Sequence, residues 1–208
     1  MINPKLKEYA ELVIIPQYKA YDGAHQPDHV YQVIENSLNI AKDYDVNLDM
    51  VYAVAVYHDL GLKFGRDGHE AASRKMIEAD LALRNFFNEE EIKTIGQAAE
   101  DHRASLPYEP RSIYGKIISE ADRDIDFERL LSRAILYSLD HYPDFVKEET
   151  YAQVYEHMTE KYGPGGRIKL WLAYEPNVRN LEKVHAILAD ESAFRPAFDK
   201  LYLKYKEQ

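Results

Sequence analysis

Apolar residues recur at helical spacing along most of the chain. Five of them between positions 28 and 44 share one helical face: Val30, Val33, Ile34, Leu38 and Ala41. Pro27 and Asp28 stand just before this stretch, and both residue types are typical of a helix start. The pattern therefore predicts an amphipathic helix that buries this face.

The next segment, from Leu48 to Leu60, is almost wholly apolar. Asn47 can cap its start, and Gly61 can end it. The run VYAVAVY alone is also compatible with a buried strand, because a short apolar run carries no periodicity. The flanking residues favour a core helix.

Further helical patterns follow toward the C-terminus. Asn88 and Glu91 match a capping box in front of an apolar face that continues to His102. A segment after Pro110 has inward apolar positions and then carries Asp122. Three more helical patterns begin at Phe127, Tyr151 and Val178. Because no segment alternates in the manner of strands joined by hairpin turns, the sequence predicts an all-α protein.

Length and composition fit one globular domain over residues 1–208. A chain of 208 residues with 46% hydrophobic residues can bury a sizeable core. The longest apolar run, Met50 to Tyr57, has eight residues, whereas a membrane helix needs roughly 20. The N-terminus lacks a signal-peptide pattern. We therefore expect a cytoplasmic protein without a membrane partner.

Charge and cysteine content narrow the chemistry further. The net charge of −10, from 36 acidic and 26 basic residues, disfavours general nucleic-acid binding. A few local cations would still suffice for a small phosphorylated molecule. The absence of cysteine excludes thiolate metal sites, iron–sulfur clusters and cysteine nucleophiles. A metal ion would have to be bound by His, Asp and Glu.

Four side chains form a candidate metal site. His29 is near the start of one predicted helix, His58 and Asp59 are near the end of the second, and Asp122 is on a later one. Imidazole nitrogens and carboxylate oxygens suit divalent cations, and packed helices can bring distant residues together. An ionised Asp59 would be costly to bury without a partner such as a metal. Taken singly, each of the four is more often a structural residue.

Four strings, in this order, carry a family resemblance: HQPDHVYQVIENSLNIA, YAVAVYHDLGL, GQAAEDHRAS and ISEADRDID. They resemble the pattern of the HD-domain superfamily of metal-dependent phosphohydrolases. The resemblance implies an all-α, HD-type metal-binding helical core over about residues 20–130. By the same resemblance His29, His58, Asp59 and Asp122 correspond to the metal ligands. Residues 131–208 are expected to add C-terminal helices that pack on this core or form an oligomer contact.

Two further histidines belong to this region. In some HD families additional histidines bind a second metal, and in others they contact phosphate. His102 continues an inward helical face and, with Asp59, is a candidate for proton transfer. His69 follows the HD pair where a glycine-containing loop opens into a helix; it is a candidate substrate contact, and helix capping near Glu70 is the alternative. His25, four residues before His29, can lie at the mouth of the cleft, but a solvent-facing loop residue is the favoured interpretation.

Basic residues near these motifs are candidates for phosphate binding. Lys63, Arg66 and Arg103 are nearest to the HD pair and His102, so we expect them to contact substrate first. The other nearby cations, Arg74 and Arg111, are interpreted as surface charges.

Together these features predict a metal-dependent phosphohydrolase, either a phosphomonoesterase or a nucleotide pyrophosphohydrolase. One or two divalent ions (Mn, Fe, Co, Ni or Mg) would activate the water that attacks phosphorus in a small phosphorylated metabolite or nucleotide. Three alternatives stay open: a catalytically silent HD-fold sensor of a metal or ligand, a di-iron oxygenase, and a purely structural helical protein. The oxygenase needs two metals and hence both His69 and His102. A homo-oligomer is compatible with the sequence.

Overall fold

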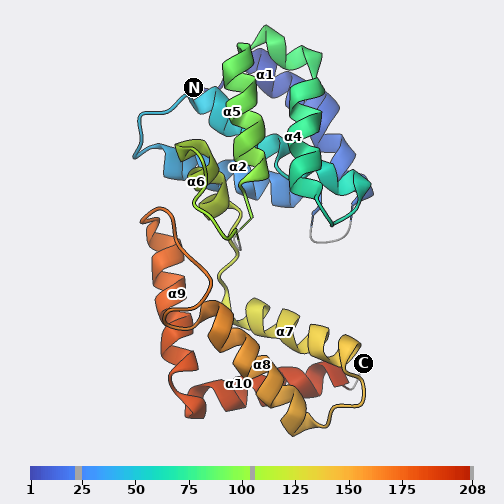
Figure 1. The fold of residues 1–208 in the computed structure, drawn as a ribbon, viewed down its shortest axis with the longest axis vertical. Coiled ribbons are helices and arrows are strands. Elements are labelled where there is room, and N and C mark those ends of the chain that lie inside the picture. Colours follow the sequence, from blue (N-terminus) through green and yellow to red (C-terminus); the bar gives the residue numbers. More distant parts are fainter. Residues whose placement is uncertain (22–24, 104–105, 207–208) are drawn as a thin grey trace. The chain divides into compact units, whose positions relative to one another are not determined.

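All regular secondary structure in the described part of the chain is helical (Figure 1). The computed structural model describes residues 1–21, 25–103 and 106–206. The predicted all-α fold is therefore confirmed. The chain divides into two compact units, Met1–Arg123 and Asp124–Gln208, which are described separately. None of the described helices combines the length and apolar character that a bilayer-spanning segment needs.

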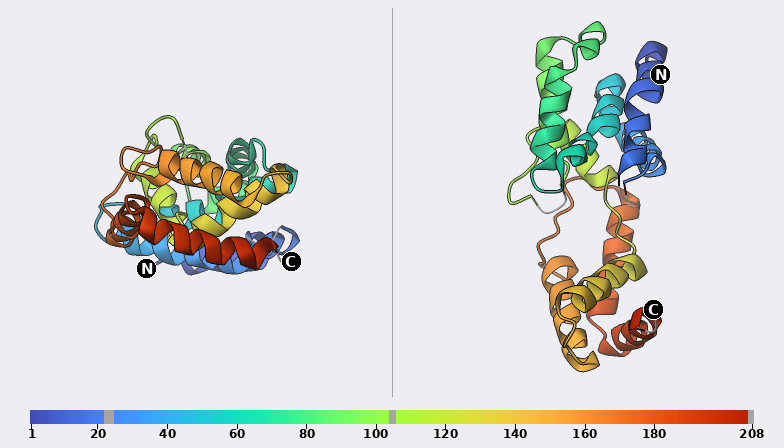
Figure 2. Two further views of the ribbon diagram at one scale, coloured as in Figure 1. Left: turned by 90° about the horizontal axis from the view of Figure 1, so that it is seen from below. Right: turned by 90° about the vertical axis from the view of Figure 1, so that its right-hand side faces the viewer.

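The first unit contains six α-helices: α1 (Pro4–Tyr9), α2 (Pro27–Ala41), α3 (Leu48–Tyr57), α4 (His69–Ala79), α5 (Glu89–Glu100) and α6 (Ile113–Ala121). Four shorter helical segments join some of them: η1 (Ala10–Ile14), η2 (Ile15–Ala20), η3 (Leu60–Phe64) and η4 (Leu81–Asn85). Helix α3 packs against α2, α5 and α6, while α4 packs against α5 and η3 (Figures 1 and 2).

Helix α3 is the core of this unit, because every residue from Met50 to Tyr57 is buried. A helix that is apolar on all sides must be surrounded by other elements. Asn47 caps it as predicted, and its side chain accepts a hydrogen bond from the Asp49 N–H at 3.0 Å. The α-helix ends at Tyr57, three residues before the predicted end at Leu60, and the chain continues into η3. The HD pair therefore lies where a buried helix ends.

Side chains cap the starts of α5 and α6, and the capping box of α5 is the predicted one. Asn88 and Glu91 form a reciprocal capping box at the start of α5, with hydrogen bonds of 3.0 and 2.9 Å. Ser112 caps α6, and this helix ends at Ala121. Asp122 therefore directly follows a helix end.

The second unit contains α7 (Phe127–His141), α8 (Lys147–Tyr162), α9 (Glu175–Leu188) and α10 (Glu191–Lys206). It has a hydrophobic core of its own, in which Tyr151 meets Phe198, and Tyr155 meets Phe194, edge to face. The helical patterns of α7, α8 and α9 are confirmed. Helix α10, which has Pro196 inside it, is not predicted from the sequence. That residues 131–208 pack on the predicted core as part of one domain stays a prediction.

An ion-pair network holds the C-terminal end of α5. The fully buried Asp101 carboxylate accepts hydrogen bonds from the Arg111 backbone N–H (2.8 Å) and from Arg111 Nε (2.9 Å). Arg111 also pairs with Glu100, which pairs in turn with Arg74 of α4 at 3.0 Å. Arg74 and Arg111 are thus parts of a structural network that fixes the chain next to His102.

Replacing Arg111 with Met should destabilise the protein by about 3 kcal/mol, because Asp101 would stay buried without its partner. This value lies at the lower end for broken buried pairs, since Arg111 is partly exposed. The matched control is Arg84→Met, which breaks the exposed pair with Glu89 and should cost less than about 1 kcal/mol. Urea unfolding followed by circular dichroism measures both. Equal losses in the two variants would contradict the structural role of Asp101.

Candidate metal centre

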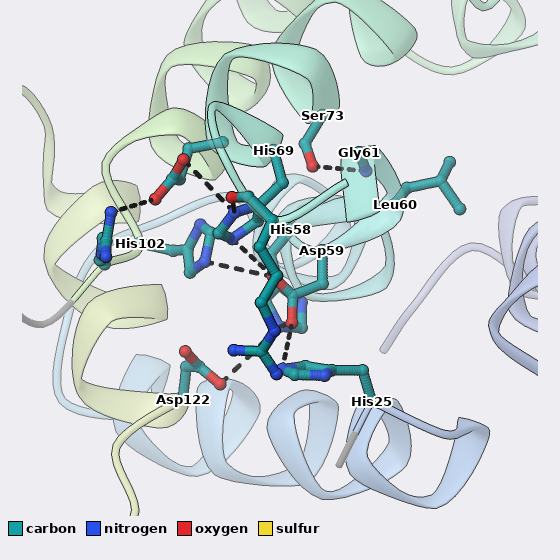
Figure 3. Close-up of polar contacts among 12 residues, drawn as sticks. His25, His58, Asp59, Leu60, Gly61, His69, Ser73, His102 and Asp122 are labelled. Atoms are coloured by element: carbon teal, nitrogen blue, oxygen red, sulfur yellow. Dashed lines mark hydrogen bonds and ion pairs between the residues drawn. The ribbon is translucent and has the colours of Figure 1, made fainter. Parts of the chain in front are cut away.

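Side chains from the ends of five helices converge around Asp59, the second residue of the HD pair (Figure 3). They are His25 and His29 at the start of α2, His58 at the end of α3, His69 at the start of α4, His102 just after α5 and Asp122 just after α6. Each of these residues lies at or near the end of a helix. Several elements can therefore approach one point.

One group of side chains faces Oδ2 of Asp59. His58 Nε2 lies 3.3 Å from this oxygen and His29 Nε2 lies 3.9 Å from it. Asp122 Oδ1 closes the group, at 3.2 Å from His29 Nε2 and 3.7 Å from His58 Nε2. The structure thus brings together all four residues that the sequence predicts as metal ligands. We call His29, His58, Asp59 and Asp122 the four-residue group.

A second group faces the other oxygen, Oδ1, of the same carboxylate. His69 Nε2 and His102 Nε2 each lie 3.3 Å from it. The ligand atoms of Asp59, His69 and His102 lie within 4.8 Å of one another, as do those of His29, His58 and Asp59. Both groups are therefore compact enough to surround a single ion. We call Asp59, His69 and His102 the three-residue group.

Backbone carbonyls fix the tautomer of three histidines. The Nδ1 atoms of His58, His69 and His102 lie 2.9, 2.7 and 2.6 Å from the carbonyl oxygens of Ala55, Arg66 and Ala99, respectively. A carbonyl oxygen only accepts, so Nδ1 must carry a proton in each ring. In the neutral ring the lone pair is then on Nε2, the atom that faces Asp59. Metal-ligating histidines are oriented in this way by a hydrogen bond to the opposite nitrogen.

Opposite charges compensate each other inside the site. Burial raises the pKa of Asp59, which is 3% exposed, but His58 and the other imidazoles lower it more strongly, well below its usual range. The pKa of Asp122 is likewise lowered, because His29, His58 and His102 together outweigh the effect of burial. Burial by itself would lower the pKa of His102, but Asp59, Asp122 and the Ala99 carbonyl raise it, so the pKa is about 9. The imidazoles thus compensate the buried carboxylates, and a divalent cation can take over this role.

The polar atoms of the four-residue group also fit a cation. Among the described residues, the buried Nε2 atoms of His29 and His58 make no hydrogen bond of regular geometry. Buried polar atoms normally have a partner, so such a pair of nitrogens beside two carboxylates needs an explanation. A metal ion bound between them would supply it.

The predicted basic residues lie at the surface of the same unit. Lys63 of η3 and Arg66 of the following turn are exposed, and both line a small pocket that also includes Tyr21. Arg103 is also exposed, and its guanidinium pairs with Glu70 of α4 at 3.2 Å. Substrate binding by Lys63, Arg66 and Arg103 stays a prediction.

His25 is the site residue that the sequence analysis misplaces. Its side chain is only 19% exposed, and Nε2 lies 3.8 Å from Asp59 Oδ2. Its ring meets the His29 ring edge to face, with the ring centres 5.8 Å apart. The favoured interpretation as a solvent-facing residue is therefore wrong, and the alternative position at the cleft is the one observed. His25 lies in the turn before α2, so helical periodicity carries no signal for it.

One solved structure and one family model resemble this chain. A crystal structure of a predicted HD superfamily hydrolase from an uncultured Thermotogales bacterium has 23% sequence identity and a TM-score of 0.49. The similarity covers 74% of this chain and 84% of that chain. No curated protein matches. The family model of the HD domain matches residues 28–124, which include both ligand groups around Asp59. Residues 28–124 are therefore an HD domain, and HD domains bind divalent metal ions.

Proposed function

We propose that the first unit binds two divalent metal ions around Asp59 and hydrolyses a phosphate ester or anhydride in a small metabolite or nucleotide. The observation that carries this proposal is the convergence of two ligand groups on the two oxygens of one buried carboxylate. A shared carboxylate is a common way to hold two ions near each other, as two-metal phosphatases require.

The two groups are unequal, and this difference assigns different roles to them. The four-residue group offers four protein ligands, whereas the three-residue group offers three and leaves more positions for water and substrate. His102 Nδ1 is engaged with a backbone carbonyl, so Nε2 is the nitrogen that it can offer to the site. A ligand role for His102 therefore excludes its predicted role in proton transfer while the ion is bound.

The chain's own residues supply orientation and charge. When bound, a divalent cation lowers the pKa of a coordinated water molecule and polarises a phosphoryl oxygen. Lys63 and Arg66 share a pocket beside η3, the segment that directly follows Asp59, and are candidates for binding a substrate phosphate. Arg103, which pairs with Glu70, is a further candidate.

A di-iron oxygenase is the second candidate function, because it also needs both ligand groups. His69 and His102 both face Asp59 Oδ1, which meets the requirement for a second metal. Iron in the purified protein, a visible absorption band and oxygen consumption would favour this reading over hydrolysis.

Replacing Asp59 with Ala should remove both ions and abolish turnover, because the two groups share this carboxylate. Elemental analysis should find two ions per chain in the unmodified protein and none in the variant. Asp43→Ala, which changes an exposed aspartate, should keep both ions. Full metal content after Asp59→Ala would show that the ligand assignment is wrong.

His69→Ala and His102→Ala should each lose the second ion and keep the first. Turnover should fall at least about 10-fold, the usual effect of disturbing a metal's ligand environment. His141→Ala, in the second unit, is the control and should change neither quantity. If both variants kept two ions and normal turnover but melted earlier, His69 and His102 would be structural residues.

Hydrolysis itself is tested with a panel of phosphorylated metabolites that includes nucleoside mono-, di- and triphosphates. Mn, Co, Ni, Mg and Fe are supplied in turn, and phosphate or pyrophosphate release is measured. Release should depend on added metal and stop with a chelator. If no substrate reacted with any metal, ligand binding without turnover would favour the sensor, and oxygen consumption would favour the oxygenase.

A further inference from the structure

Two residues after Asp59, the chain packs against the start of α4 more closely than any side chain at Gly61 would allow. A Cβ atom there would lie 2.1 Å from the carbonyl oxygen of His69 and 2.5 Å from the backbone nitrogen of Ser73. It would also lie 2.9 Å from Ala72 Cβ. None of these atoms can rotate away, so a larger residue must push α4 and η3 apart.

A buried hydrogen bond joins the same two segments. The Gly61 N–H donates to Ser73 Oγ at 2.8 Å, and both residues are buried (Figure 3). An unpartnered backbone N–H in such a place would cost free energy, so the hydroxyl of Ser73 favours the close approach. Close backbone packing and the hydrogen bond thus act at the same point.

This contact lies between Asp59 and one particular ligand. Gly61 meets the backbone of His69 itself, and His69 Nε2 lies 3.3 Å from Asp59 Oδ1. Of the ligands in the two groups, His69 is the one carried by α4, while His102 follows α5. A shift of α4 relative to η3 would therefore change the position of His69 before that of any other ligand.

We propose that Gly61 and Ser73 are positioning residues for His69, and that they set its distance from Asp59 and hence the affinity for the second ion. This inference rests on the proposed function, in which His69 is a ligand of the three-residue group. Neither residue touches the ion or the substrate. Their effect is transmitted through the backbone at the start of α4.

Gly61→Ala should lengthen the distance between His69 Nε2 and Asp59 Oδ1 and lower the affinity for the second ion. The expected loss of affinity is about 10- to 100-fold, as for other groups that orient metal ligands. The first ion should bind as before, because all four of its ligands, His29, His58, Asp59 and Asp122, lie outside α4. A general loss of stability would not produce this difference between the two ions.

Two further variants separate positioning from loss of fold. Gly96→Ala makes the same chemical change on α5, where the added Cβ would lie 3.1 Å from Arg74 Cγ, a contact that a small shift of this side chain relieves. It should leave both ions unaffected. Ser73→Ala removes the hydrogen bond without adding volume. It should lower the affinity for the second ion, but by less than Gly61→Ala does. It also keeps the inference testable if Gly61→Ala does not fold.

The experiment is a titration of the metal-free proteins with Mn²⁺, followed by calorimetry and by electron paramagnetic resonance. Spin coupling between two nearby Mn²⁺ ions reports occupation of the second site. Crystal structures of metal-free Gly61→Ala and Ser73→Ala supply the distance between His69 Nε2 and Asp59 Oδ1. That distance is 3.3 Å in the unmodified protein and should increase.

The inference would be supported if Gly61→Ala and Ser73→Ala lowered the affinity for the second ion and left the affinity for the first unchanged. Gly96→Ala should change neither affinity. An unchanged distance, an unchanged second affinity, or an equal loss in Gly96→Ala would overturn the inference. If the unmodified protein bound a single ion, the two-ion proposal would fail. The crystallographic distance would then decide between a positioning role for Gly61 and none.

Discussion

The burial of the Asp59 carboxylate is the constraint on which the first unit depends. A buried charge is tolerated only with compensating charge and hydrogen bonds, and Asp59 obtains these from imidazoles that face both of its oxygens. The apolar α3 places this carboxylate at the centre of the unit, because the helix ends directly before the HD pair. The same arrangement provides the negative charge that a divalent cation needs.

Three histidines of the site are held from the side opposite Asp59. Carbonyl oxygens three residues earlier in the chain orient the rings of His58, His69 and His102 so that Nε2 faces Asp59. The Asp101–Arg111 network fixes the end of α5 beside His102, and the contact at Gly61 fixes the start of α4 beside His69. Preorganisation of this kind lowers the cost of binding an ion, since little freedom remains to be lost.

The two oxygens of Asp59 face unequal surroundings, and this links structure to the proposed chemistry. The side with four protein ligands suits an ion that stays bound, while the side with three leaves room for water and a phosphoryl oxygen. Lys63 and Arg66 provide positive charge near the HD pair of a protein whose net charge is −10. A local concentration of cations can therefore attract an anionic substrate despite the overall charge.

The sequence by itself determined most of the helices and the candidate four-residue group. Apolar periodicity and capping residues are local properties, so they fixed α2, α3 and the capping box of α5, and the ordered motif pointed to the candidate ligands. Only the tertiary structure decided that His69 and His102 share one oxygen of Asp59, and that His25 lies beside the other. It also decided the partner of Arg111 and the close contact at Gly61. These contacts join different helices, and the packing distance between two helices is not contained in the periodicity of either one.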